Sequence, residues 1–263
     1  MISARTSKAN PMWPRLKAPI LRTGASLLAM ASLIVSQGSF AAADAAGSVY
    51  LVRLTPSQYE RSILDVFGPG VQVTRNTVGT GFRDEGLLAI GTRRIAITSA
   101  EMQQYEKLAQ GISNQVVDPR RRDTLVGCKP RSETAPDASC AGSFFEKVGL
   151  FLFRRPLSKV ELDLFLATHT EAATQLGSFN AGIAAALSQM LVAPEFLFRL
   201  ETTEPDPARP GMQRLDAYSA ASRLSYLLWD SSPDAGLLAA AKSGRLQTTE
   251  GLQQQVERML MSP

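Results

Sequence analysis

The chain has 263 residues, of which 44% are apolar and 20% are charged, an ordinary composition for a globular protein. Its formal net charge is +4, but five of the basic residues and no acidic residue lie before Asp44. Without those five, 28 basic residues become 23, against 24 acidic ones. The rest of the chain is close to neutral, so net charge argues against nucleic-acid binding.

Residues 1–43 have the three parts of a secretory signal peptide. Basic residues precede an apolar run from Gly24 to Val35, and small residues follow it as far as Ala43. This order predicts cleavage after Ala41 or Ala43 and a periplasmic or secreted protein. An uncleaved membrane anchor is the alternative, but the run is shorter than the roughly 20 apolar residues that span a bilayer. We therefore expect no stable membrane span once the leader is removed.

Residues 44–140 are predicted to form an N-terminal helical module with an irregular loop. Thr55 and Thr98 each stand three residues before a Gln or Glu, the spacing of a capping box, which predicts that a helix starts after each of them. Between these helices, the Gly-rich segment 71–97 is predicted to be irregular, with room for short β-strands. It lacks the Gly-x-x-x-x-Gly-Lys spacing of a phosphate-binding loop.

The chain has two cysteines, Cys128 and Cys140, in a polar connection between helices. In an exported protein such a pair predicts a disulfide bond. A metal site is the alternative, but it needs about four ligands at close spacing, and the only histidine, His169, is distant in the sequence. The chain has no Cys-x-x-Cys-His motif, so it cannot itself attach c-type haem.

Residues 141–201 are predicted to form a central helical module, because eight of the 11 Phe residues lie between positions 144 and 200. The apolar spacing and the Pro and Gly breaks predict helices at about 143–153, 158–176 and 179–192, with a short one after Pro194. His169 lies within the second of these helices, where we expect a surface or partly packed side chain.

A Pro-rich segment, 202–214, is predicted to be a linker. The C-terminal module, 215–263, is predicted to contain helices that start after Asp216 and Asp234, and a last helix after them. The apolar pattern of that last helix is still running where the chain stops, so we expect this module to be incomplete. The predicted fold class is mostly α, with bundle-like subdomains of several helices.

Three arginines next to apolar helical faces are candidates for ion pairs or for an anion site: Arg154, Arg155 and Arg223. Arginine in such a position often holds a carboxylate through two parallel bonds. The candidate carboxylates are Glu161 or Glu195 for Arg155, and Asp65 or Asp230 for Arg223. Ion pairing within the chain is the reading that the sequence favours.

Four segments carry motifs that resemble one known family. They are Arg-Leu-Thr-x-x-x-Tyr-x-x-x-Ile-x-Asp-x-x-Gly at 53–68, Phe-Arg-Arg-Pro-Leu-Ser-x-x-Glu at 153–161, Ala-Pro-Glu-Phe-Leu-Phe-Arg at 193–199, and Ala-Ser-Arg-Leu-Ser-Tyr-Leu-Leu-Trp-Asp-Ser-x-Pro-Asp at 221–234. Together they resemble the N-terminal modules of planctomycete-type, cytochrome-c-associated secreted proteins of unknown function.

The resemblance implies a mostly helical, exported protein. In longer relatives a segment with a Cys-x-x-Cys-His haem site follows the helical modules, so haem c is expected only on a partner or on a downstream segment missing from this chain. The resemblance supplies no catalytic residues, and its link to haem is one of association.

Two functions follow as hypotheses. The first is a helical scaffold or binding module of a redox assembly, with a haem-bearing exported protein or domain as its partner. The alternative is an exported protein that binds or degrades a polysaccharide, in which paired carboxylates act on the sugar and Trp229 stacks on a sugar ring. The candidate carboxylates are Asp65, Asp84, Glu85, Asp230 and Asp234. Asp234 also fits a helix cap after Pro233, and Trp229 a core position. The sequence favours these structural roles.

Overall fold

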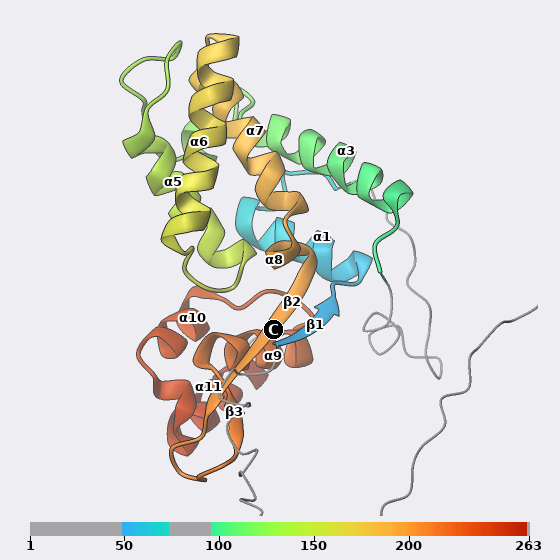
Figure 1. The fold of residues 1–263 in the computed structure, drawn as a ribbon, viewed down its shortest axis with the longest axis vertical. Helices are drawn as coiled ribbons and strands as arrows, with labels where there is room; N and C mark the ends of the chain where they lie inside the picture. Colours follow the sequence, from blue (N-terminus) through green and yellow to red (C-terminus); the bar gives the residue numbers. More distant parts are fainter. Residues whose placement is uncertain (1–48, 74–95, 262–263) are drawn as a thin grey trace, which may run out of the picture. The chain divides into compact units, whose positions relative to one another are not determined.

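The computed structural model describes residues 49–73 and 96–261, and the helices that it contains dominate the fold (Figure 1). The elements, in chain order, are β1 (Val49–Arg53), α1 (Pro56–Phe67), α3 (Ser99–Val116), α4 (Arg122–Leu125), α5 (Ala138–Leu152), α6 (Lys159–Leu176), α7 (Phe179–Val192), α8 (Pro194–Leu197), β2 (Phe198–Pro205), β3 (Gln213–Leu215), α9 (Ala217–Leu228), α10 (Ala235–Lys242), η2 (Arg245–Gln247) and α11 (Thr249–Leu260). The predicted fold class, mostly α with a short β component, is confirmed.

Helix starts follow the capping residues in the sequence. Thr55, Thr98 and Ser158 each form a complete capping box, in which the hydroxyl accepts from the third helical N–H and the Gln or Glu there bonds back. These bonds satisfy N–H groups that otherwise lack a partner at a helix start. At the other end of α6, Gly177 has φ 57°, a left-handed conformation that glycine adopts without a steric penalty.

The main core lies among α1, α3, α5, α6 and α7. Figure 1 shows α7 beside both α6 and α3, and these two helix pairs make close contact. Aromatic rings link the elements: Tyr59 of α1 lies 5.1 Å from Phe196 and 5.5 Å from Tyr105 of α3, measured between ring centroids. The concentration of Phe in the central segment is thus used inside the core, as Phe144, Phe145, Phe179 and Phe196 are fully buried.

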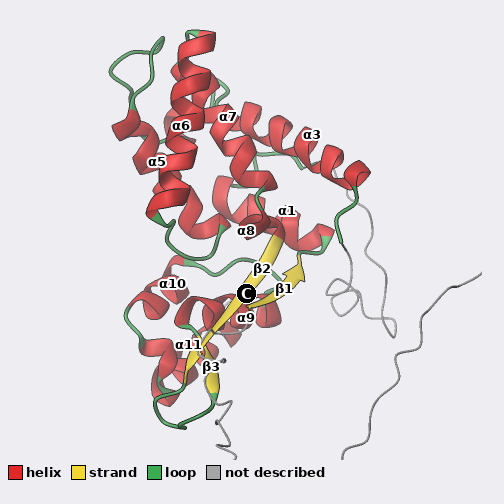
Figure 2. Ribbon diagram, in the orientation of Figure 1, coloured by secondary structure: helices red, strands yellow, loops and turns green. Residues whose placement is uncertain are grey.

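A small antiparallel sheet lies beside α8 and α9, in the order β1-β2-β3 (Figure 2). β1 pairs with the first half of β2, with Leu51 opposite Leu200, and β3 pairs with the second half, with Arg214 opposite Glu204. The segment 202–214, which was expected to be a linker, therefore contains the second half of β2, the turn and most of β3. Most of 71–97, where the sequence left room for short strands, lies outside the described residues.

A second, smaller core is formed by the elements after β3. Its buried members are Ala221, Leu237, Ala240, Ala241, Leu246 and Met259, from α9, α10, η2 and α11. The division of the chain into modules at 140 and near 202–214 stays a prediction.

The predicted disulfide joins Cys128 to Cys140, whose Cα atoms lie 5.6 Å apart. It connects the segment after α4 to the first turn of α5. α5 begins at Ala138, five residues before the start expected at 143, because Asp137 caps it: its carboxylate accepts from the N–H groups of Ser139 and Cys140.

The predicted signal peptide, residues 1–43, lies outside the described residues. Within 49–73 and 96–261, no helix is long and apolar enough to cross a membrane.

His169 is completely buried, which corrects the expectation of a surface or partly packed residue. Its ring lies 5.0 Å from that of Phe179 and 6.2 Å from that of Phe145, both edge-on. The close approach of α6 and α7 produces this burial: a Cβ at Gly182 would lie 2.5 Å from the His169 carbonyl oxygen. The sequence pattern of α6 did not indicate the burial of His169, because the glycine that permits it, Gly182, lies on α7.

The protein is expected to lose stability as the pH falls below about 6.5, because burial lowers the pKa of His169 from 6.5, despite an opposing effect of the Asp137 charge. Below that pH the unfolded chain binds a proton at His169 and the folded protein does not. The free energy of unfolding therefore falls by at most about 1.4 kcal/mol per pH unit. Urea unfolding at pH 7.5 and 5.0 measures this loss. His169→Gln removes the titrating group, so an equal loss in that variant would contradict the assignment.

Candidate binding cleft

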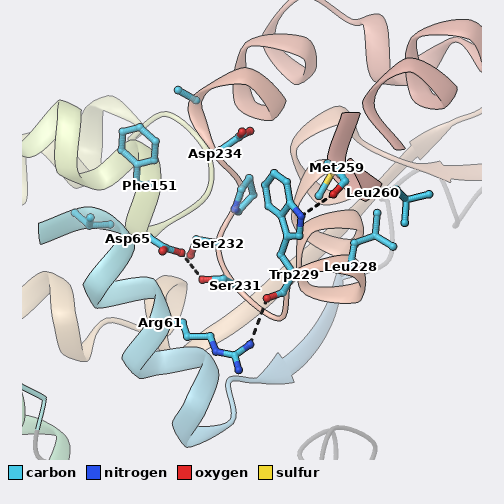
Figure 3. A pocket seen from close by; sticks show the side chains of 13 residues that line it. Arg61, Asp65, Phe151, Leu228, Trp229, Ser231, Ser232, Asp234, Met259 and Leu260 are labelled. Atoms are coloured by element: carbon cyan, nitrogen blue, oxygen red, sulfur yellow. Dashed lines mark hydrogen bonds between the residues drawn. The ribbon is translucent and has the colours of Figure 1, made fainter. Parts of the chain in front are cut away.

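A cleft of about 850 Å³ lies between α1, the end of α5, the α9–α10 connection and the end of α11 (Figure 3). Four kinds of side chain line it. The charged ones are Arg61, Asp65 and Asp234, the aromatic ones are Phe151 and Trp229, and the hydroxyls are Ser231 and Ser232. Leu228, Met259 and Leu260 add apolar surface on one side.

The spacing of residues on α1 gives this helix two different faces. Tyr59 and Ile63, four residues apart, are buried in the main core. A second set, Gln58, Ser62 and Asp65, is spaced by four and three residues, so its members lie on one neighbouring face of the helix. This face meets the α9–α10 connection. α1 therefore joins the core to one wall of the cleft.

Asp230, which follows the C-cap residue of α9, has φ 53°, a left-handed conformation that costs a non-glycine residue about 1–2 kcal/mol. Two side chains of α1 hold it: Gln58 Nε2 donates to Oδ1 at 2.7 Å, and Arg61 Nη1 donates to Oδ2 at 3.1 Å. Arg61 also donates to the Trp229 carbonyl oxygen. The bonds direct the Asp230 carboxylate toward α1.

Beneath the cleft, three buried hydroxyls form a triangle. Ser62 Oγ lies 3.0 Å from Tyr226 Oη, Tyr226 Oη lies 3.2 Å from Ser232 Oγ, and Ser232 Oγ donates to Ser62 Oγ at 2.9 Å. A buried hydroxyl without a partner is costly. Ser62 Oγ also donates to the Gln58 carbonyl oxygen at 2.7 Å, and such a connected set of bonds holds its members in one arrangement. This triangle joins α1 to α9 and to the connection after it.

Asp234 is both a helix cap and an ion-pair partner. It accepts from the Leu237 N–H at 2.8 Å and from both terminal nitrogens of Arg258, at 2.7 and 3.0 Å. Burial acts to raise the pKa of Asp234, but the bonds from Arg258 and Leu237 outweigh it, so the pKa is lowered. Asp234 is therefore ionised and held in place at neutral pH.

Asp65 is held differently. Its carboxylate is exposed and accepts a hydrogen bond from the Ser231 hydroxyl, and no cation among the described residues pairs with it. Of the five carboxylates proposed for sugar chemistry, Asp65 and Asp234 line the cleft, whereas Asp230 is turned to Gln58 and Arg61. The other two, Asp84 and Glu85, lie outside the described residues.

Trp229, the candidate stacking residue, lines the cleft and is half-buried. Its indole N–H donates to the Met259 carbonyl oxygen at 3.0 Å, which fixes the ring. The Arg258 guanidinium lies 5.6 Å from the ring centroid, within range of a cation–π interaction. Its partly apolar, partly open position fits both of the roles that the sequence suggested.

The three candidate arginines lie in separate environments. Arg155 bonds to both carboxylate oxygens of Glu161, at 2.7 and 2.9 Å, and this pairing lowers the pKa of Glu161 to about 2. Arg223 pairs with Glu201, a buried residue of β2, rather than with Asp65 or Asp230. The reason is that α9 packs on β2, a strand that the sequence pattern did not indicate.

Arg154 is buried and meets carbonyl oxygens instead of a carboxylate. Its guanidinium donates to the backbone of Glu195, Phe196 and Phe198, around the end of α8, and to Tyr226 Oη. No anion among the described residues lies against it, so Arg154 joins α5 to the α8–β2 junction. Within the described residues there is also no group of three or more His, Cys, Asp or Glu side chains placed to hold a metal ion.

Two family models match the chain. Residues 140–201 match one described as "PSD5: Protein of unknown function (DUF1595)", and residues 215–263 match one described as "PSD4: Protein of unknown function (DUF1592)". No curated protein and no solved structure matches the chain. The two matched ranges contribute Phe151, residues of the segment 228–235, Met259 and Leu260 to the cleft, and α1 supplies its remaining wall.

Proposed function

We propose that this chain is an exported, helical binding module of a cytochrome-c-associated redox assembly, similar to the planctomycete-type secreted proteins. Three observations support the proposal: the leader predicted at 1–43, the motifs at 153–161, 193–199 and 221–234, and the two matched models of unknown function. The proposed partner carries haem, on a separate exported protein or on a segment downstream of this chain.

The cleft carries the binding part of this proposal. Both matched ranges and α1 contribute to it, so segments far apart in the sequence line one concave site. Asp230, Asp234 and Trp229 are each held by bonds from a neighbouring element. A pre-formed cleft with fixed polar groups and apolar walls is typical of binding sites. The Cys128–Cys140 disulfide fits an oxidising compartment.

The test uses the full chain with a C-terminal affinity tag, purified from the exported fraction of cells that produce it. We expect a co-purifying protein that stains for covalently bound haem on a denaturing gel. Ala235→Trp places a bulky ring in the cleft and should reduce that staining about tenfold. Ala167→Trp, on the exposed surface of α6, is the matched control.

The proposed function is wrong if no haem-bearing protein co-purifies and a protein extended by its downstream segment carries no covalent haem either. It is also wrong if Ala235→Trp captures as much haem-bearing protein as the control does. A thermal melt of both variants shows whether either substitution disturbs folding.

Polysaccharide binding is the second candidate, because Trp229, Asp65 and Asp234 line the same cleft (Figure 3). It ranks second since Asp234 is already occupied as a helix cap and as the partner of Arg258. Retention on insoluble polysaccharides that is lost in Trp229→Ala would favour it. Equal retention of both proteins would exclude Trp229 from such a role.

A further inference from the structure

We infer that the cleft binds a lysine-bearing segment of a protein partner, with the lysine ammonium at Asp65 and its methylene chain against the aromatic walls. This inference rests on the proposed binding function and names the chemistry of the partner at the same site. It follows from the charges of the cleft, from its walls and from its size.

The charges in and around the cleft leave one carboxylate without a cation. Arg61 pairs with Asp230, and Arg258 pairs with Asp234 through two bonds. Asp65 receives only the Ser231 hydroxyl among the described residues. The cleft therefore has an unbalanced negative charge at Asp65, which a cation from a partner would neutralise.

The walls fit a long, apolar side chain with a charged end. Phe151 and Trp229 line the cleft around Asp65, and Val66 adds an aliphatic surface. Lysine buries its methylene groups on apolar surface while its ammonium stays with polar groups. An aromatic face also attracts a cation, as the position of Arg258 over Trp229 shows in this protein.

The size of the cleft indicates a peptide segment rather than a free amine. Its volume of about 850 Å³ exceeds what a single alkylammonium ion would fill. A lysine together with the residues on either side of it would occupy this space.

The test measures binding through the fluorescence of Trp229 in the full chain, with Trp13→Phe so that Trp229 is the only tryptophan. The probes are a capped Leu-Lys-Leu peptide, its ε-acetyl-lysine analogue and n-butylammonium. We expect the peptide to bind, and Asp65→Asn to weaken it about tenfold, which corresponds to about 1.4 kcal/mol. Acetylation of the lysine should weaken binding by a similar factor. The control Asp123→Asn, at an exposed site on α4, should not.

Equal binding to the Asp65→Asn protein would overturn the inference, as would equal binding of the acetylated peptide. Butylammonium that binds as tightly as the peptide would show that the site takes a free amine instead of a protein segment. The two proposals fail separately. Capture of a haem-bearing partner without any effect of Asp65 would overturn only the lysine inference, and Asp65-dependent peptide binding without such a partner would overturn only the redox assignment.

Discussion

Replacing Arg154 by Ala is expected to lower the free energy of unfolding by about 3–5 kcal/mol, since several carbonyl oxygens lose their donor at once. Arg154 is 3% exposed, and its guanidinium donates to the Phe198 carbonyl oxygen at 2.7 Å as well as to the carbonyls of Glu195 and Phe196. Alanine would take this donor from one buried carbonyl, that of Phe196, and from two partly buried ones. An unsatisfied buried polar group costs about 1–3 kcal/mol. Urea unfolding followed by circular dichroism measures the loss.

Three further variants separate the causes. Arg154→Lys keeps the charge but loses the planar fork that reaches several oxygens, so it should recover little of the stability. Arg154→Gly should be less harmful than Arg154→Ala by about 1 kcal/mol, because residue 154 has φ 59° and glycine adopts this conformation without strain. Arg120→Ala, at a residue whose side chain is 90% exposed, is the control, with an expected change below about 0.5 kcal/mol. A loss of less than about 1 kcal/mol in Arg154→Ala would show that the junction does not depend on this side chain.

Helix positions followed from local signals, and so they were predictable. Helix caps act within one helical turn, and a sequence pattern covers that distance. The caps in question are the capping boxes at Thr55, Thr98 and Ser158 and the glycine at 177. The start of α5 was missed because Asp137 precedes Ala-Ser-Cys-Ala-Gly, small residues that show no apolar spacing. Asp137 is a capping residue, but the sequence after it lacks the helical spacing of apolar residues by which such a cap is identified.

The sheet was not predictable in the same way, since its pairing is not local. β1 pairs with β2, so that Val52 lies opposite Arg199. The sequence of one strand does not indicate which strand is its partner. The apolar run of α8 continues into β2 without a polar break. For this reason the sequence suggested a short helix followed by a linker, and Glu201 as the partner of Arg223 was missed with the strand that carries it.

The same distinction applies to the cleft. Arg155 and Glu161 are near in sequence, and their pairing was one of the two expected. Asp65 and Asp234 were singled out as carboxylates, but their positions in one cleft depend on how α1 meets the α9–α10 connection. The triangle of Ser62, Tyr226 and Ser232 was missed, because serine and tyrosine hydroxyls have no spacing that marks them as partners before the fold brings them together.

Removing the disulfide is expected to lower the free energy of unfolding by about 1–3 kcal/mol. The cross-link closes a loop with a sequence separation of 12, and it acts mainly by restricting the unfolded chain. Pro130 and Pro136 already restrict that chain, which favours the lower part of this range. Urea unfolding of the double variant Cys128→Ala, Cys140→Ala measures the effect, and alanine is chosen because Cys140 is buried.

Other bonds should keep the 128–140 loop folded at neutral pH after the cross-link is removed. Asp137 accepts from the Arg131 N–H at 3.0 Å and from its Nε at 3.1 Å, and the Glu133 carbonyl oxygen accepts from the Phe179 N–H. We therefore expect an unchanged helix content in the variant, with faster proteolysis confined to the loop.

Acid should expose the difference between the two proteins. The hydrogen bond from the Arg131 N–H, together with that from Cys140, lowers the pKa of Asp137 from 3.8 to about 2. Its stabilising effect is present above about pH 4 and is lost as the pH falls through 2. At pH 2 the variant loses both constraints, so pepsin should cleave its loop well before that of the natural protein. Alkylation without reductant, on protein from the exported fraction, checks the premise: two free thiols there would show that the disulfide does not form in the cell.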